Sequence, residues 1–151
     1  MDVLPMTSTK KKMTLDSADL IKRGEEAMQG LAENFDAWMN DELARLLDAR
    51  RTVLEEGVTE VALDALHVVA HDMKGSSSTY GYPLAARVAA TLSVLTEKVV
   101  EKEPTLDLIN AHVDAIRAII QGGIKEADNP VGMEIADNLQ NIVESRTAET
   151  G

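Results

Sequence analysis

The sequence has no cysteine in its 151 residues. That absence excludes a disulfide framework, a zinc or iron–sulfur site held by thiolates, and a thiol nucleophile. Aromatic side chains are also scarce, at 3% of the residues. The apolar content therefore comes from Leu, Val, Ile, Ala and Met, which favours helices over a β-sandwich.

Long apolar runs and an excess of positive charge are missing as well. No apolar segment is long enough to span a membrane, and the N-terminal residues lack the apolar stretch of a secretory signal. Fifteen basic and 26 acidic residues leave a net charge of −11, which argues against a sequence-independent nucleic-acid binder. We therefore expect a cytoplasmic domain that binds neither nucleic acid nor a membrane.

Proline and glycine divide the chain into segments with apolar residues at helical spacing. The expected helices start near Asp16 and at Phe35, Thr59, Leu84, Pro104 and Pro130. In the first of them, Leu20, Ala27, Met28 and Leu31 are expected to face inward. No segment alternates with period two. These patterns predict an all-α fold, an antiparallel up-down-up-down four-helix bundle with accessory N-terminal and C-terminal helices.

The expected limits of the domain follow from the same segments and from the local composition of the two termini. Residues 1–14 are polar and include Lys10, Lys11 and Lys12, so we expect a flexible N-terminal tail there. Residues 15–146 are expected to form a single domain, and residues 147–151 a C-terminal tail. No linker is long enough to imply a second domain.

The segment over residues 60–78 separates into an apolar and a polar face when it is drawn as a helix. Ala62, Leu66, Val69 and Met73 share the side expected to face the core. The opposite side holds Glu60, Asp64, His67, His71, Lys74, Gly75 and Ser78. His71 lies near the middle of that polar face, with an ammonium group one turn later.

Gly75 is the least expected residue on this face. A glycine inside a helix costs about 1 kcal/mol relative to alanine, and the apolar pattern continues past it. Such a glycine usually marks a close approach to the backbone. A neutral imidazole is a good nucleophile that can carry a phosphoryl group, and a nearby ammonium group offsets the phosphoryl charge. Together these residues indicate phosphoryl transfer between proteins.

The run from Ala70 to Gly81 resembles the histidine-containing phosphotransfer (HPt) domain, in its bacterial form. That family has a histidine, two further residues, Lys-Gly, and a second glycine ten residues after the histidine. His71, Lys74, Gly75 and Gly81 match this pattern. A new apolar helix then follows, as in the family. The family motif commonly ends in adjacent Leu-Glu, whereas Thr96 separates Leu95 from Glu97 here.

The resemblance implies a phosphorelay intermediate of two-component signal transduction and not an enzyme with its own ATP-binding domain. His71 would accept a phosphoryl group from an aspartyl phosphate of a response-regulator receiver domain, and Lys74 would assist electrostatically. His67, Val68, Gly75 and Ser78 would form the docking surface. The chain would need no cofactor, because Mg²⁺ would be bound by the receiver. A hybrid histidine kinase is one source of such a receiver, and we expect this chain to be a monomer.

Three other interpretations stay open. The run from His71 to Lys74 also resembles the phosphorylated box of a histidine kinase, but only 80 residues follow His71. A dimeric kinase-like phosphotransferase bundle is compatible with that length. His67 and His71 have the spacing of a metal-binding helix, although Val68 stands where a catalytic glutamate would be needed, and His112 is the one further histidine. A non-catalytic helical interaction module is the third.

Overall fold

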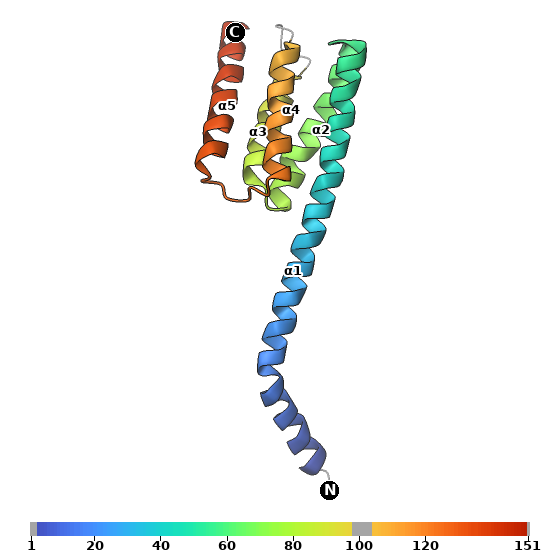
Figure 1. Ribbon diagram of the computed structural model, residues 1–151, viewed down its shortest axis with the longest axis vertical. Coiled ribbons are helices and arrows are strands. Elements are labelled where there is room, and N and C mark those ends of the chain that lie inside the picture. The colour runs from blue at the N-terminus through green and yellow to red at the C-terminus, as the bar shows by residue number, and fades with distance from the viewer. Residues whose placement is uncertain (1–2, 98–103, 151) are drawn as a thin grey trace. The chain divides into compact units, whose positions relative to one another are not determined.

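The computed structural model describes residues 3–97 and 104–150, with side chains for residues 17–97 and 104–146. Five helices and no strand occur in this part of the chain (Figure 1). They are α1 (Val3–Glu56), α2 (Glu60–Thr79), α3 (Pro83–Leu95), α4 (Leu106–Gln121) and α5 (Pro130–Thr150). The all-α class expected from the sequence is therefore confirmed. None of the described helices is long and apolar enough to cross a membrane.

The chain divides into two compact units, Met1–Phe35 and Asp36–Gly151, and α1 contributes residues to both. The sequence placed the boundary after residue 14 and separated two helices near residue 31. In the structure α1 is helical from Val3 onward and has no break there, because Gly24 and Gly30 lower helix propensity without preventing the helix. At the other terminus α5 extends to Thr150, so it includes most of the expected tail, and Gly151 lies outside the described residues.

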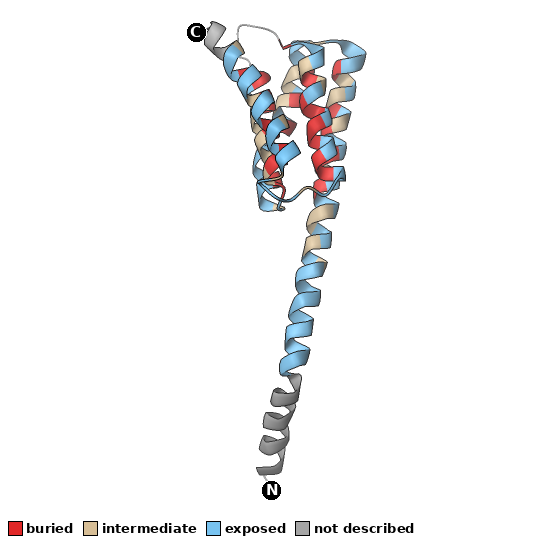
Figure 2. Ribbon diagram, turned by 60° about the vertical axis from the view of Figure 1, so that its left-hand side comes forward, coloured by how far each residue is buried: buried red, intermediate tan, exposed pale blue. Residues whose placement is uncertain are grey.

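The first unit contains a helix whose described side chains are not buried. None of residues 17–35 is classed as buried, and Leu20 and Met28 are 60% and 75% exposed (Figure 2). The expectation that Leu20, Ala27, Met28 and Leu31 face inward was therefore wrong. An apolar stripe identifies which side of a helix can be buried, but it does not show that the same unit supplies a partner.

The second unit has one hydrophobic core, built from the stripes that the sequence predicted. The buried members include Met39, Leu43, Leu46, Val53, Ala62, Leu66, Val69, Met73, Leu84, Val88, Leu92, Leu95, Ile109, Val113, Ile116, Ile120, Leu139 and Val143. Trp38 and Leu54 share the helical spacing of α1 but are 44% and 51% exposed. The ring of Trp38 lies 5.6 Å from that of Tyr80, centroid to centroid, near the end of α2.

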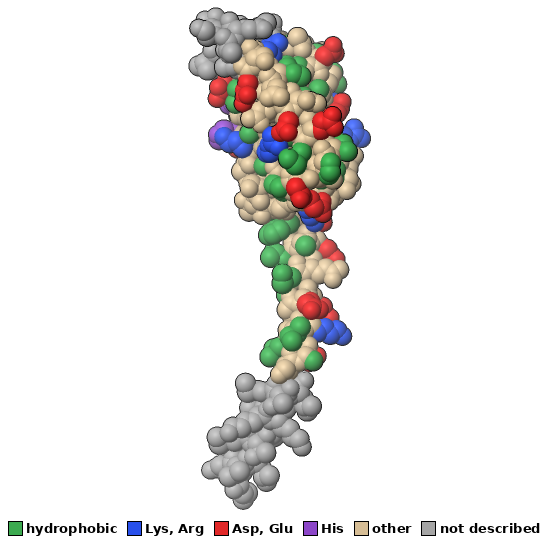
Figure 3. Space-filling model, turned by 90° about the vertical axis from the view of Figure 1, so that its left-hand side faces the viewer, with side chains coloured by type: hydrophobic (Ala, Val, Ile, Leu, Met, Phe, Trp, Pro, Cys, Tyr) green, Lys and Arg blue, Asp and Glu red, His purple; other side chains and the backbone are tan. Residues whose placement is uncertain are grey.

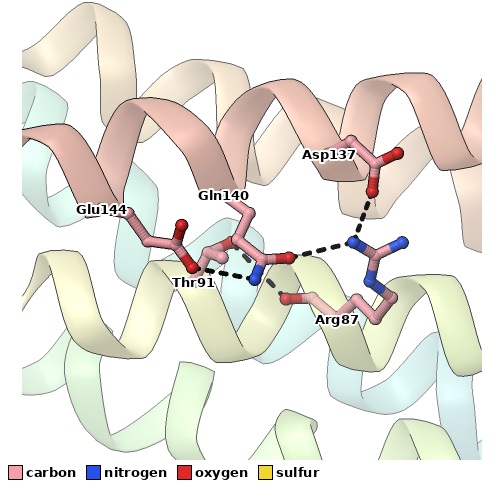
Figure 4. A network of polar contacts seen from close by, with 5 residues as sticks. All are labelled: Arg87, Thr91, Asp137, Gln140 and Glu144. Atoms are coloured by element: carbon pink, nitrogen blue, oxygen red, sulfur yellow. Dashed lines mark hydrogen bonds and ion pairs between the residues drawn. The ribbon is translucent and has the colours of Figure 1, made fainter.

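Helix α3 contacts α2, α4 and α5. Polar side chains on α3 and α5 join these two helices (Figure 4). The guanidinium group of Arg87 donates to Asp137 at 2.7 Å and to Gln140 at 3.0 Å. Gln140 in turn donates to Glu144 at 3.0 Å. Because these groups bond to one another, the polar residues between the two helices are already paired.

The turn between α2 and α3 is anchored by Tyr82. Its hydroxyl donates to the carboxylate of Asp36 at 2.8 Å, and the ammonium group of Lys125 lies 2.9 Å from the same carboxylate oxygen. The hydrogen bond from Lys125 lowers the pKa of Asp36. Burial, reinforced by the Asp36 carboxylate, raises the pKa of Tyr82 to about 12. This cluster connects α1, the α2–α3 turn and the segment before α5.

Candidate functional site

The candidate site lies on α2, whose two ends are set by local sequence. The hydroxyl of Thr59 accepts a hydrogen bond from the backbone N–H of Ala62 at 3.2 Å, as an N-cap does. At the other end, Gly81 has φ of +87°. Its N–H donates to the carbonyl of Ser78, and the N–H of Tyr82 donates to that of Ser77. This is a Schellman motif, which requires the left-handed conformation that glycine adopts readily.

His71 and Lys74 lie one turn apart on the exposed side of α2. No hydrogen bond or ion pair joins either side chain to another residue with a described side chain. The four residues predicted for the opposite face, Ala62, Leu66, Val69 and Met73, are all buried. The imidazole of His71 is therefore open to a reacting group, and the ammonium group of Lys74 is not committed to a carboxylate of the described chain. Figure 3 shows histidine, lysine or arginine, and acidic side chains gathered at one edge of the second unit.

Gly75 leaves open space beside His71. A Cβ atom added at Gly75 meets no heavy atom within 4 Å outside its own helical turn, and its backbone is not in the left-handed region. Neither internal packing nor a turn therefore explains the glycine. By contrast, a Cβ atom on Gly132 in α5 would lie 2.5 Å from Cδ1 of the buried Leu84, so packing does explain that glycine.

His67 differs from the solvent-facing neighbour expected from the sequence. Its ring is half-buried, and Nδ1 lies 2.9 Å from the carbonyl oxygen of Ser93 and 3.1 Å from the hydroxyl of Thr96. A carbonyl oxygen only accepts, so Nδ1 carries the proton and donates it. The ring centroid of His67 lies 6.2 Å from that of His71. His67 thus joins α2 to the end of α3, a contact that a helical wheel of α2 alone does not include.

Val68 and Ser78, the two other expected docking residues, are exposed on α2. Val68 is 54% exposed and precedes His71 by one turn. Ser78 lies two turns after His71 on the same polar face. The structure therefore brings Val68, Gly75 and Ser78 around His71 on a single exposed face.

Arg45 was missed by the sequence analysis. Its guanidinium group, on α1, lies 3.5 Å from the carboxylate of Asp72 and 3.2 Å from that of Glu42. Asp72 is the neighbour of His71 in the chain, so Arg45 reduces the negative charge next to the imidazole. No sequence signal identified this residue, because 27 positions separate it from Asp72 and only packing brings them together.

His112 does not join the other two histidines. It is fully buried in α4, where Nδ1 donates to the carbonyl of Leu108 at 2.8 Å. Its Nε2 has no hydrogen-bond partner in the described chain. Burial lowers the pKa of His112, and the hydrogen bond to Leu108 offsets that only in part. Across the side chains described, no three His, Asp or Glu residues lie close enough to hold a metal ion.

A hollow of about 610 Å³ lies between α3 and α5, and none of the three histidines lines it. Its lining residues are Arg87, Ala90, Thr91, Val94, Gln140, Val143 and Glu144. Arg87, Gln140 and Glu144 are the residues bonded to one another in Figure 4. The hollow therefore offers few uncommitted polar groups, whereas on the polar face of α2 the side chains of His71 and Lys74 are both uncommitted among the described residues.

Comparisons of this chain with protein-family models, with curated proteins and with solved structures found no match. The functional interpretation therefore rests on the residues of α2 and on their surroundings.

Proposed function

We propose that this protein is a phosphorelay intermediate of the HPt type, in which His71 carries the phosphoryl group. One observation supports this most strongly. His71 is exposed at the centre of one face of α2, with the exposed ammonium group of Lys74 one turn later and open space at Gly75. A nucleophile, a cation and an access route for a protein partner therefore occur together.

The proposed reaction is transfer of a phosphoryl group from a receiver aspartate to His71. An unprotonated ring nitrogen of His71 attacks phosphorus, a P–N bond forms, and the P–O bond to the aspartate breaks, so that the aspartate leaves as a carboxylate. Transfer to a second receiver reverses these steps. Lys74 offsets charge on the phosphoryl oxygens, and Arg45 reduces the repulsion from Asp72. Mg²⁺ belongs to the receiver in this proposal.

The proposed fold is the four-helix bundle of the HPt type, formed by residues 36–56 of α1 together with α2, α3 and α4. Three-residue connections, 57–59 and 80–82, join α1 to α2 and α2 to α3, and such short connections favour antiparallel neighbours. α5 would be the accessory C-terminal helix on α3. This arrangement supports the function because it leaves the polar face of α2 uncovered.

Phosphotransfer to single-histidine variants tests the proposal. The protein is incubated with a receiver domain labelled on its aspartate, and acid-labile label on this chain is measured. His71→Gln is expected to abolish labelling without changing helicity. His67→Gln is the matched control, since it makes the same change one turn away, and it is expected to retain labelling. Labelling of the His71→Gln variant at the wild-type level would refute the assignment.

A further inference from the structure

The two histidines of α2 form a pair of which the proposed phosphotransfer uses only one member. His67 and His71 are four positions apart in the chain, so they lie one turn apart on the same side of the helix. Their ring centroids are 6.2 Å apart. Imidazole is a common ligand of divalent transition-metal ions such as Zn²⁺, Cu²⁺ and Ni²⁺. Two histidines at this spacing on a helix can bind one such ion together.

The hydrogen bond of His67 leaves its second ring nitrogen available to a metal ion. Because Nδ1 donates to the carbonyl of Ser93 at 2.9 Å, Nε2 carries no proton in the neutral ring and keeps its lone pair. Histidines that bind metal ions almost always donate their other N–H in this way, to a carbonyl or a carboxylate. No described residue bonds to Nε2, and this atom is not buried. His67 therefore has the tautomer and the accessibility of a metal ligand.

His71 can complete the pair by a small movement of its ring. An ion about 2.0–2.1 Å from each nitrogen, with tetrahedral geometry, places the two ring centroids about 5 Å apart. The observed separation is 6.2 Å, so the rings need to approach by about 1 Å. His71 is exposed and bonds to no described residue, so this movement breaks no contact. The hydrogen bond of His67 stays in place.

Charged side chains on both sides of the pair affect the binding of a cation. Asp64 precedes His67 by one turn on the same face, and Glu97 follows the end of α3 that His67 contacts. Both carboxylates favour a cation there. Lys74 follows His71 by one turn, and its ammonium group opposes one. The nearby charges therefore sum to a negative value, as does the charge of the whole chain, −11.

We propose that His67 and His71 bind one divalent transition-metal ion, through Nε2 of His67 and an unprotonated ring nitrogen of His71. Coordination takes up the lone pair with which His71 would attack phosphorus, so the ion and a phosphoryl group exclude each other at that nitrogen. The ion is therefore an inhibitor and not a cofactor. This inhibition rests on the proposed function, whereas the binding of the ion does not.

The proposed site has fewer protein ligands than a structural zinc site. Among the described side chains, no third His, Asp or Glu lies close enough to join the two histidines. Water would occupy the remaining positions of the ion, and the pair lies at the surface. We therefore expect an ion that exchanges with solvent, in contrast to the closed four-ligand sites that stabilise folds.

Titration calorimetry of the intact protein with ZnCl₂ tests the site. Few other ligands compete, because the chain has no cysteine and three histidines. One ion per chain is expected, and His67→Gln and His71→Gln are each expected to weaken binding roughly tenfold or more. His112→Leu removes a histidine outside the pair and is the control, with unchanged affinity. Absence of binding at submillimolar Zn²⁺, equal affinity of His67→Gln and wild type, or one ion per two chains would overturn the proposal.

Lys74→Ala gives a test that alters neither ligand. Removing the ammonium group is expected to raise the affinity for Zn²⁺ a few-fold at low ionic strength, because a nearby positive charge opposes the ion. The same variant is expected to slow phosphotransfer, so its effects on the two activities have opposite signs. Weaker binding of Zn²⁺ by Lys74→Ala would contradict the proposed pair of ligands.

The inhibition is tested with phosphoramidate, a small phosphoryl donor that needs no receiver. Zn²⁺ is expected to slow the labelling of His71 in the wild type, and EDTA to restore it. His67→Gln is expected to be labelled equally with and without Zn²⁺. Mg²⁺, which prefers oxygen ligands, is expected to have no effect. Equal slowing of wild type and His67→Gln by Zn²⁺ would overturn the inhibition, whereas failure of transfer from a receiver would refute the proposed function alone.

Discussion

The imidazole of His67 donates a hydrogen bond from Nδ1 to the carbonyl oxygen of Ser93, with the two atoms 2.9 Å apart. This bond joins α2 to the C-terminal part of α3 one turn before His71. The polar face of α2 therefore contains two histidines with different surroundings. His67 is held by its neighbours, whereas His71 is exposed and has no bonding partner among the described side chains. The difference leads to distinct expectations for their variants.

His67→Ala is expected to lower the free energy of unfolding by about 1 kcal/mol, because the carbonyl of Ser93 loses the hydrogen bond from Nδ1 at 2.9 Å and keeps the longer one from the hydroxyl of Thr96 at 3.3 Å. Urea unfolding followed by circular dichroism measures this change. His67→Gln, which keeps an N–H donor, is expected to recover part of the loss. If His67→Ala instead leaves stability unchanged but abolishes phosphotransfer, His67 contacts the partner and does not stabilise the packing of α2 on α3.

Lys74→Ala is expected to slow phosphotransfer without preventing it. The phosphoryl group in transfer spreads negative charge over its oxygens, and one nearby cation contributes about 1–3 kcal/mol, which is roughly 5- to 150-fold in rate. Rapid-quench measurement of transfer from a labelled receiver gives the rate. Arg117→Ala on α4 removes the same charge from an exposed side chain outside the site, and it serves as the control. Equal rates for wild type and Lys74→Ala would remove Lys74 from the mechanism.

Gly75→Ala is expected to increase the free energy of unfolding by up to about 1 kcal/mol, because the added Cβ atom meets open space and alanine favours the helix. The same variant is expected to slow transfer, since it narrows the access beside His71. Gly75→Gln and Gly75→Glu are expected to slow it further, and glutamate most, because it adds negative charge near the phosphoryl group. Thermal unfolding and transfer rates are measured on each variant.

Gly132→Ala is expected to have the opposite effects on stability and on the transfer rate. It is therefore the control for the thermal unfolding and the phosphotransfer measurements on Gly75→Ala. Its Cβ atom would crowd Leu84, so stability is expected to fall while the transfer rate stays near that of the wild type. If Gly75→Ala lowers stability in the same way, Gly75 is required for packing and the proposed docking face is misplaced.

His112 is expected to make stability depend on pH in the acid range. Its pKa is lowered by burial, so the folded state favours the neutral ring. Stability from this group is present above the ordinary pKa of histidine, about 6.5, and is lost as the pH falls through that value toward the lowered one. Urea unfolding between neutral and mildly acidic pH measures the slope. His112→Leu is expected to remove this slope, and an unchanged slope would exclude His112 as its source.

The sequence by itself determined the helical class and the core of the second unit. Apolar residues three or four positions apart, with glycine or proline between segments, predicted the stripes that contain Leu66, Leu92 and Ile116, all of which are buried. Helical periodicity also placed His71, Lys74 and Gly75 on one face of α2, because side chains separated by one turn share a side of the helix. Those relationships are local, so a single segment is sufficient to specify them.

The tertiary structure decided everything that depends on a second element. The hydrogen bond from His67 to Ser93, the ion pair between Arg45 and Asp72, and the burial of His112 all depend on how the helices pack. The tertiary structure also left Leu20 and Met28 exposed on a helix that periodicity alone would place against a core. In each case the periodicity shows which side of a helix a residue occupies. What lies opposite that side depends on how helices distant in the sequence pack, and spacing along one segment contains no information about it.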